Sequence, residues 1–248
     1  MDLVIDVHNH TIVSGHAYST VQEIAAEASR KGLKMIGITD HGPAMPGAFS
    51  SSFIGNLSIL PDFIYGVEVL RGVEANILDQ SGKLDVPERR LKRLDVIIAG
   101  LHDACVRPWD TKGNTLALIN AMENKYVDII AHPGNPAFQI DKEAVVLKAR
   151  ETNTLIEINN GSFYSKSRFG SKDNCYEIAR LCKKHEVSII VGSDSHFSFE
   201  VGRFDKAIKL LEDVQMPEEL IMNTSVDKLK KYLIKKGKER YGKQANTD

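Results

Sequence analysis

The sequence predicts an α/β barrel of parallel strands, and its length and its alternating patterns are the observations that indicate it. The chain has 248 residues, a normal length for one barrel of about 200–250 residues. Short β-rich runs alternate with amphipathic helical patterns, as in parallel βα units. We therefore expect one barrel domain over residues 1–248, with a polar tail of roughly 20 residues at its end.

Seven short runs are the expected strands. Each is rich in branched apolar residues and is separated from the next by a helical pattern or a turn. They cover residues 2–8, 34–40, 68–75, 94–102, 127–133, 154–160 and 187–194. Residues 43–66 contain glycine, proline, serine and aromatic residues, so we expect a long loop there, with room for a short helix.

The helices between these runs carry their own signals. Ser19 and Gln22 have the spacing of a capping box, apolar residues follow at helical spacing, and Gly32 predicts the end of the helix. Cys175 and Cys182 fall on the apolar face of a later helix. We therefore expect these two cysteines in the core and not in a metal site.

Two features are expected at the surface. The lysine-rich stretch 225–237 predicts a helix with a solvated charged face, and residues 243–248 predict a disordered end. His185 follows the polar end of a predicted helix, so it is expected outside any metal site.

The composition limits the partners and the compartment. Hydrophobic residues make up 42% of the chain, charged residues 26%, and the net charge is −1, which gives no reason to expect nucleic acid or an anionic membrane. No apolar run approaches the roughly 18–20 residues of a membrane span, and the start of the chain lacks a secretory signal pattern. Three cysteines without paired spacing favour a reducing cytoplasm.

The first strand carries an unusual pattern. Asp6, His8 and His10 alternate with apolar residues in VIDVHNHT. Side chains two positions apart on a strand share a face, so these three should point one way while Ile5 and Val7 pack against helices. An HxH pair by itself is also common among hydrogen-bonded core histidines, so the interpretation depends on the other strands.

Metal-binding residue types recur where the later strands end. Seven of the eight histidines lie at or near these ends, and the carboxyl ends of the strands form the active-site face of a parallel barrel. Besides His8 and His10, the candidate ligands are His16, His41, Glu74, His102, His132, Asp194 and His196. About nine donors exceed the roughly three protein ligands of one catalytic zinc ion. They suit two or three ions, with zinc expected and Mn²⁺, Fe²⁺ or Co²⁺ as alternatives.

The candidate ligands occur in the order of a known set of motifs, here HNH, TDH, GVE, GLHD, AHPG and SDSH. The chain resembles the PHP (polymerase and histidinol phosphatase) superfamily over residues 2 to about 200. The run EINNGSF…SRFGSKDNC (157–175) resembles the small stand-alone bacterial phosphatases of the YcdX type. This resemblance implies a distorted seven-stranded (βα) barrel, a trinuclear zinc site and a trimeric homo-oligomer.

The resemblance also implies how the donors are shared among the ions. His8, His10, Glu74 and Asp194 would hold one ion, Glu74, His102 and His132 a second, and His16, His41 and His196 a third. Asp6, Asp40 and Asp103 adjoin ligands in the sequence. Either they accept hydrogen bonds from imidazole rings, which would orient the ligands, or they cap strand ends and turns.

Hydrolysis assisted by metal ions is the chemistry that this set of residues favours. The sequence has no P-loop, no GxGxxG and no GxSxG elbow, so covalent catalysis by a side chain is not indicated. A metal-bound hydroxide attacking a small phosphate monoester is the expected reaction, and no side chain is assigned as general acid. Arg168, Asn159 and Asn160 are the candidates for holding phosphate oxygens.

Two other functions stay open at this point. Amidohydrolase and TatD-like enzymes also begin with HxH on a barrel strand, but binuclear amidohydrolases commonly use a carboxylated lysine on the fourth strand, where this chain reads VIIAGLH. PHP domains attached to DNA polymerases suggest a nuclease-type module, yet the sequence has no basic stripe. A phosphatase acting on a small phosphorylated molecule is the favoured hypothesis.

Overall fold

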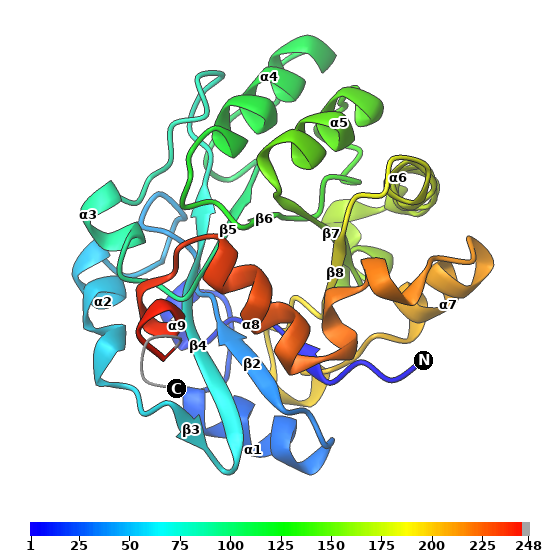
Figure 1. The fold of residues 1–248 in the computed structure, drawn as a ribbon. Coiled ribbons are helices and arrows are strands. Elements are labelled where there is room, and N and C mark those ends of the chain that lie inside the picture. Colours follow the sequence, from blue (N-terminus) through cyan, green and yellow to red (C-terminus); the bar gives the residue numbers. More distant parts are fainter. Residues whose placement is uncertain (245–248) are drawn as a thin grey trace.

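Seven parallel strands are arranged as a nearly closed barrel with helices around its outside (Figure 1). The computed structural model describes residues 1–244. Neighbouring strands pair in the order β1, β2, β4, β5, β6, β7, β8, and every pair along this path is parallel. The strands are β1 Ile5–Asp6, β2 Met35–Ile38, β4 Val67–Asn76, β5 Val96–Gly100, β6 Ile129–Ile130, β7 Leu155–Asn159 and β8 Ile189–Gly192. Each overlaps one of the seven predicted runs, which confirms the predicted fold class.

Most helices pack their apolar faces on the outer side of the sheet (Figure 1). They are α1 Val21–Arg30, α2 Ser51–Asn56, α3 Glu88–Leu91, α4 Thr111–Met122, α5 Lys142–Thr152, α6 Ser171–Lys184, α7 Asp205–Asp213, α8 Val226–Lys235 and α9 Glu239–Gln244. Cys175 and Cys182 are buried on α6, as predicted. His185 ends α6 and contacts Glu143 at 2.8 Å. Within residues 1–244, no helix combines the length and the apolar character that crossing a membrane requires.

Short 3₁₀ helices occupy several loops. They are η1 Ile12–Ser14, η2 Leu57–Ile59, η3 Gly161–Phe163, η4 Lys166–Arg168, η5 Ser198–Glu200, η6 Glu218–Leu220 and η7 Met222–Thr224. Four of them, η1, η3, η4 and η5, belong to the loops that leave the carboxyl ends of β1, β7 and β8. These loops are therefore shaped by local hydrogen bonds at the end of the barrel where the candidate ligands lie.

The long loop predicted for residues 43–66 contains more structure than the sequence indicated. The expected short helix is present as α2, and it is followed by η2. The strand β3 Phe63–Ile64 was missed: it pairs with β4 in antiparallel fashion. Tyr65 and Gly66 connect the two strands, with φ of 50° and 77°. Two consecutive left-handed residues form the type of two-residue turn that matches the twist of a hairpin.

The first helix begins one residue later than the predicted capping box implied. Thr20 is the N-cap, its side chain accepts a hydrogen bond from the Glu23 backbone, and Glu23 returns a carboxylate to the Thr20 N–H. The predicted Ser19 is buried instead and accepts a hydrogen bond from the backbone of Ser198. The Ser19–Gln22 prediction was wrong. Ser19–Gln22 and Thr20–Glu23 both have the spacing of a capping box, but only the Glu23 carboxylate accepts from the N–H of an N-cap residue.

The alternation predicted for the first strand does not extend to the histidines. Ile5 and Val7 lie inside the barrel with apolar residues of the other strands, and do not pack against the outer helices. The regular strand β1 ends at Asp6, so the two-residue period no longer sets the direction of the side chains beyond that point. His8 and His10 reach the interior from the irregular segment after β1.

One asparagine joins the two strands that leave the barrel incompletely closed. The ends of β1 and β8 meet through a parallel bridge between Asn9 and Ser195. At the other end of this seam, the buried amide of Asn223 donates to the carbonyl groups of Ile5 and Val191, each at 2.8 Å, and accepts from the Val191 N–H at 2.7 Å. The side chain of Asn223 thus replaces the backbone hydrogen bonds that a continuous sheet would make between β1 and β8.

The amino-terminal end of the barrel is covered by α8, which crosses the strands in Figure 1. Leu229, Tyr232 and Leu233 are buried with the apolar side chains of the barrel interior. The Tyr232 hydroxyl donates to the carbonyl oxygens of Asp128 and Asn153, which precede β6 and β7. The helix predicted for 225–237 is confirmed, but this segment is a packed plug and not a loose polar tail.

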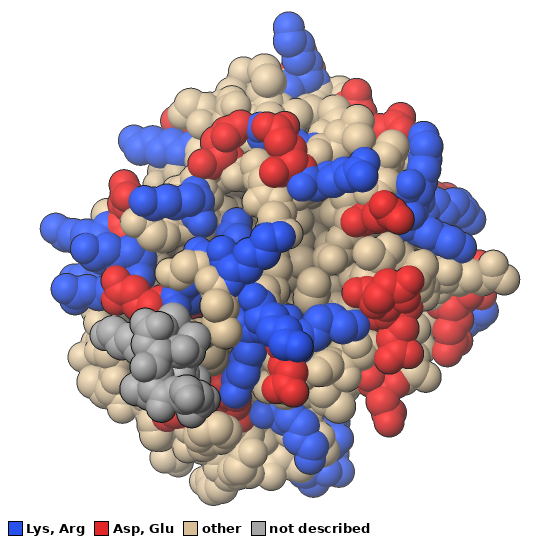
Figure 2. Space-filling view, viewed as in Figure 1, with Lys and Arg blue, Asp and Glu red and all other residues tan. Residues whose placement is uncertain are grey.

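The outer face of this plug carries the predicted charges. Figure 2 shows Lys and Arg side chains gathered around the face that α8 covers. The charged run is amphipathic, and its apolar side supplies the burial that holds it in place. Of the disordered end predicted for 243–248, residues 243 and 244 belong to α9, and residues 245–248 lie outside the described part of the chain.

We predict that truncating the buried side of α8 destabilises the protein, whereas truncating its exposed side does not. Leu233 is 0% exposed and its neighbour Ile234 is 42% exposed. Leu233→Ala should lower the free energy of unfolding by about 2–5 kcal/mol, and Ile234→Ala should change it by about 0.5 kcal/mol or less. Urea denaturation of both variants measures the difference. Equal effects would show that α8 does not plug the barrel.

Candidate active site

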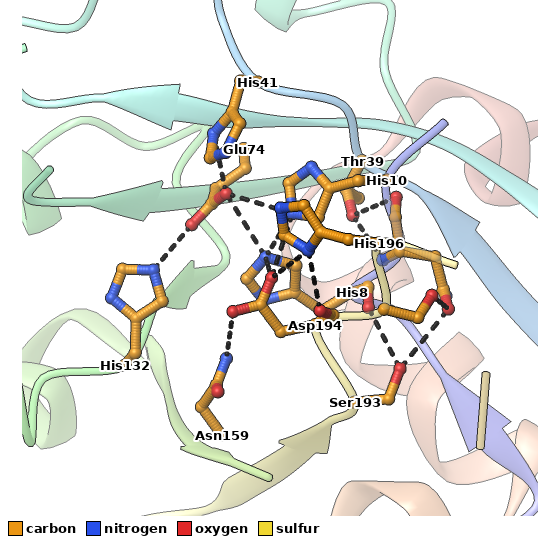
Figure 3. Close-up of polar contacts among 12 residues, drawn as sticks. His8, His10, Thr39, His41, Glu74, His132, Asn159, Ser193, Asp194 and His196 are labelled. Carbon is orange, nitrogen blue, oxygen red and sulfur yellow. Dashed lines mark hydrogen bonds and ion pairs between the residues drawn. The ribbon is translucent and has the colours of Figure 1, made fainter. Parts of the chain in front are cut away.

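The nine predicted ligands meet at the carboxyl end of the barrel, where a cavity of about 610 Å³ opens. Figure 3 shows most of them converging from different strands. Glu74 lies within β4, and the others lie in the loops that follow β1, β2, β5, β6 and β8. His16 follows η1 and is exposed, whereas His8, His10, Glu74 and Asp194 are buried. All nine positions singled out in the sequence are therefore brought to one site.

The carboxylate of Glu74 is the centre of this cluster. Its Oε1 lies 2.8 Å from Nε2 of His132 and 3.0 Å from Nε2 of His102. Its Oε2 lies 2.9 Å from Nδ1 of His41, and it is also within 3.4 Å of Nε2 of His8 and His10. Burial by itself would raise the pKa of Glu74, but the surrounding imidazoles, His102 first, hold that pKa well below its usual range.

Asp194 is the second carboxylate of the cluster. Its Oδ1 lies 3.1 Å from Nε2 of His10 and 3.5 Å from Nε2 of His8. Its Oδ2 accepts hydrogen bonds from Arg168 and from the Asn159 amide. Burial opposes ionisation of Asp194, but the charge of Arg168 and the nearby imidazoles hold its pKa well below the ordinary value. The carboxylate thus presents one ionised oxygen to the histidines and one to the β7 side of the site.

His16 and His196 face each other through nitrogen atoms that both lack a proton in the neutral rings. Nδ1 of His16 lies 3.1 Å from the carbonyl oxygen of Ser14, and Nδ1 of His196 lies 3.0 Å from that of Asp194. A carbonyl oxygen only accepts, so each ring keeps its proton on Nδ1. The two Nε2 lone pairs then point at each other across 3.0 Å. Such an arrangement is repulsive unless a cation lies between them.

His8 and His10 repeat this arrangement deeper in the site. Nδ1 of His8 lies 2.6 Å from the Glu157 carboxylate. Nδ1 of His10 lies 2.9 Å from the Ser14 hydroxyl, which donates its own proton to Asp40 and therefore accepts from the ring. In the neutral rings both Nε2 atoms are then unprotonated, and they lie 3.1 Å apart. A second pair of lone pairs thus converges beside the two carboxylates.

The charges and unpaired polar atoms of the cluster favour the binding of a cation. Burial opposes protonation of His8, yet the three carboxylates around it, Glu157 first, raise its pKa well above the ordinary value. Nδ1 of His41 and Oε2 of Glu74 are buried and make no hydrogen bond within the described residues, although they lie 2.9 Å apart. Buried polar atoms without a partner are costly, and a cation bound at this point would satisfy both.

These donors fit metal ions, and their distances indicate which ones group together. Three sets each lie close enough to share one ion: His8 with His10 and Asp194, His41 with Glu74 and His102, and His10 with His41 and His196. Nε2 of His132 lies 3.3 Å from that of His102, on the Oε1 side of Glu74. The grouping differs from the implied one at His41, which lies against Glu74 as well as near the His16–His196 pair.

Two of these residues have a backbone conformation that few residues other than glycine adopt. His132 has a φ of 31° and Asp194 a φ of 57°. The left-handed region is unfavourable for side chains with a Cβ and persists where the surrounding structure demands it. Both residues lie where a strand turns into a loop, so the strain directs their side chains into the site.

Glu157 is the functional residue that the sequence analysis missed. It is buried on β7; Oε1 contacts the ring of His8, and Oε2 accepts from the backbone N–H of His132 at 2.8 Å and from Asn159 at 3.0 Å. A side chain at Gly192 would collide with the Glu157 carboxylate, so this position of β8 needs glycine. A charged residue inside the apolar strand LIEIN was the signal in the sequence, since an unpaired charge is rarely buried there.

The three predicted acceptors of imidazole hydrogen bonds have other roles. Asp6 accepts from the backbone N–H groups of Ser193 and Gly202, and it fastens the loops after β8. Asp40 binds Thr11 and Ser14, and reaches His10 only through the Ser14 hydroxyl. Asp103 is exposed and lines the cavity. Within the described residues none of the three accepts directly from a ring, because Asp6 and Asp40 are occupied by backbone and hydroxyl donors and Asp103 points to solvent at the cavity.

Of the three predicted phosphate-binding residues, Arg168 and Asn160 line the cavity, and Arg168 is the one that carries a charge. Arg168 lines the cavity and pairs with Asp194. The amide of Asn159 is buried and is used by Glu157, Asp194 and Ser162. That of Asn160 accepts from the first N–H groups of α7, at 2.9 and 3.0 Å, and so caps this helix. Asn159 therefore shapes the site with its hydrogen bonds already used, whereas Asn160 lines the cavity and uses its oxygen to cap α7.

The sequence is similar over nearly its whole length to curated bacterial proteins named probable phosphatases. The protein of Acetivibrio thermocellus is 57% identical over 240 residues, which cover 97% of this chain and 98% of that protein. That of Caldanaerobacter subterraneus subsp. tengcongensis is 57% identical over 243 residues, 98% of this chain and 95% of the relative. A Clostridium botulinum relative is 56% identical over 238 residues, with 96% and 97% coverage.

Two solved structures share the fold at 14% identity. One is the histidinol phosphate phosphatase of Lactococcus lactis, in complex with zinc, L-histidinol and phosphate, with a TM-score of 0.57 over 85% of this chain and 93% of that one. The other is a chain from the structure of archaeal ribonuclease P with mature tRNA, with a TM-score of 0.56 over 96% and 90%. The sequence profile of the PHP domain matches residues 6–242, and the chain therefore belongs to the PHP domain family.

Proposed function

We propose that this protein is a metal-dependent phosphatase that hydrolyses a small phosphate monoester. The observation that carries the proposal is the convergence of imidazole Nε2 atoms, whose Nδ1 atoms are already paired with acceptors, on two buried carboxylates. Nε2 atoms meet in pairs at 3.1 Å for His8 and His10, and at 3.0 Å for His16 and His196. The names of the relatives support the same activity, as does the zinc and phosphate in the structure of the fold neighbour.

Three ions would account for all nine donors. His8, His10 and Asp194 would hold the deepest ion, and His102 and His132 a second one, with Glu74 between the two. His16 and His196 would hold the outermost ion, with His41 placed to serve both it and Glu74. Zinc suits a site of imidazole and carboxylate donors, and Mn²⁺, Fe²⁺ and Co²⁺ are the alternatives.

Bound metal ions supply Lewis acidity and make hydroxide available near neutral pH. The residues of this chain hold the donor atoms in place and orient the substrate. Glu157 fixes the direction of the His8 ring. The Ser14 hydroxyl donates to Asp40 and accepts from His10, so it links the His10 ring to this carboxylate. Arg168 neutralises one oxygen of Asp194 and lines the cavity, so its remaining N–H groups are placed to bind phosphoryl oxygens.

We predict that the purified protein cleaves p-nitrophenyl phosphate much faster than its bis-ester or single-stranded DNA. A monoester dianion fits a cationic pocket better than a diester with one charge. Side-by-side rates with the three substrates, before and after treatment with a chelator, measure the preference. Cleavage of DNA or of the diester as the main activity would contradict the phosphatase assignment and favour a nuclease.

His16→Ala should remove one ion and leave the others. His16 is exposed, its ring nitrogens face His196 and a backbone carbonyl, its ring stacks on that of His41, and it is not part of the apolar core. The variant should keep about two ions per chain where the parent holds about three, with lower activity and an almost unchanged melting temperature. Elemental analysis of proteins purified in parallel gives the count, and His185→Ala, on the outer surface, is the control. Loss of no metal, or of all of it, would contradict three separate sites.

Glu157→Gln should weaken metal binding by about 10–100-fold while the fold persists. The change removes the carboxylate that holds His8 by Nδ1 and His132 by its backbone N–H. Competition with a chelating dye gives the affinity, and circular dichroism checks the fold. Glu68→Gln is the matched control, because Glu68 is also a buried strand carboxylate but is paired with Lys230 at the opposite end of the barrel. An unchanged affinity in Glu157→Gln would exclude a positioning role.

A further inference from the structure

The guanidinium group of Arg203 stacks on an aromatic ring at the cavity wall. Arg203 lies in the loop between η5 and α7, and its guanidinium group is centred 3.6 Å from the centroid of the Tyr164 ring. The Tyr164 hydroxyl donates to Asp205, the first residue of α7. Both Arg203 and Tyr164 line the cavity. Stacking on a ring that is itself hydrogen-bonded fixes the plane of the guanidinium group before any ligand arrives.

The hydrogen-bond donors of this arginine are unused. Within residues 1–244, the guanidinium group of Arg203 makes no hydrogen bond, and its nearest carboxylate oxygens, on Glu200 and Asp205, are both 3.7 Å away. Asp205 already accepts from Tyr164 and Asn160, and the Glu200 side chain is 46% exposed. A guanidinium group has five donors in a fork that matches a carboxylate or a phosphate. Arg203 is thus oriented toward the cavity with its binding capacity available.

Arg203 and Arg168 have different positions in the site. Arg168 is bound to Asp194 and so belongs with the imidazole cluster, whereas Arg203 has no contact with any of the nine candidate ligands. The cavity of about 610 Å³ is far larger than a phosphate group needs. Met45 and Leu101 contribute apolar surface to the β2 and β5 side of the cavity, where Asp103 is the exposed carboxylate, and strand order places β5 across the barrel from β8. The β7–β8 side carries both arginines of the cavity lining, Arg168 and Arg203.

We propose that Arg203, held on Tyr164, binds a second anionic group carried by the leaving group. The substrates are then small phosphate monoesters whose alcohol part bears a carboxylate or another phosphate. This inference rests on the proposed phosphatase function, because it assigns the phosphoryl group to the imidazole cluster and the second anion to Arg203.

The chain contains a matched control for this arrangement. On α6, Arg180 lies 5.6 Å from the ring of Tyr176, whose hydroxyl donates to Asp213. The three residue types are the same as at Arg203, but Arg180 and Tyr176 are not among the residues that line the cavity. Removing Arg180 therefore reproduces the loss of a surface arginine on a tyrosine ring without affecting a ligand-facing donor.

The test compares Arg203→Met, Arg203→Lys and Arg180→Met with the parent holoenzyme on two pairs of substrates. O-Phospho-L-serine differs from O-phosphoethanolamine only by its carboxylate, and fructose 1,6-bisphosphate differs from fructose 6-phosphate by its second phosphate. In the parent, phosphoserine, fructose 1,6-bisphosphate or both should have a higher kcat/KM than the partner compound without the second anionic group, and the pair that shows it identifies the anion. Arg203→Met should lower kcat/KM for that member by about tenfold and leave p-nitrophenyl phosphate turnover unchanged. Arg203→Lys should recover part of the loss, and Arg180→Met should behave as the parent.

Calorimetric titration of the same four compounds separates this proposal from the phosphatase assignment. If none is hydrolysed but the member with the second anionic group still binds more tightly and loses that advantage in Arg203→Met, the phosphatase function fails and the anion subsite stands. If the parent turns over and binds both members of each pair equally well, the subsite proposal is wrong while the phosphatase function stands. An equal loss for both members of a pair in Arg203→Met would also overturn it.

Discussion

A single buried carboxylate, that of Glu74, organises the carboxyl end of this barrel. Imidazoles that follow four different strands lie within 3.4 Å of its two oxygens. A negative charge without water around it is stable only when positive charge or hydrogen-bond donors surround it. The loops after β1, β2, β5 and β6 therefore have to place their histidines within a few ångströms of Glu74, and this requirement constrains where each of these strands ends.

The two ends of the barrel have different roles: the amino-terminal end is packed and closed, and the carboxyl end holds the candidate active site. At the amino-terminal end, α8 and the amide of Asn223 close the interior with apolar packing and backbone hydrogen bonds. This closure makes the opposite end rigid enough to hold left-handed backbone at His132 and Asp194 and lone pairs that face each other. Strained and repulsive arrangements of this kind persist only where the surrounding structure is over-determined. The sequence profile of the PHP domain covers residues 6–242, a range that includes α8.

The orientation of the ligands depends on contacts between residues far apart in the chain. Glu157 holds His8 across 149 positions of sequence, and Ser14 lies between His10 and Asp40. The aspartates near ligands in the sequence were the natural candidates for this role, yet Asp6 and Asp40 are used by backbone and hydroxyl donors and Asp103 is exposed. The partners of these ring nitrogens come instead from β7 and from the loop after β1, and a sequence without its fold does not say which residue of a strand or loop faces inward.

The sequence by itself determined the fold class, the seven strands and the nine candidate ligands, because alternating apolar runs and histidines at strand ends are local patterns. It misplaced the first capping box by one residue, missed the β3 hairpin and read the packed helix α8 as the start of a polar tail. Only the tertiary structure decided how the donors are grouped, that Asn159 and Asn160 are used internally, and that Glu157 and Arg203 belong to the site. These features depend on the closure of the barrel, which brings β1 beside β8 and sets the distances between side chains that no local pattern encodes.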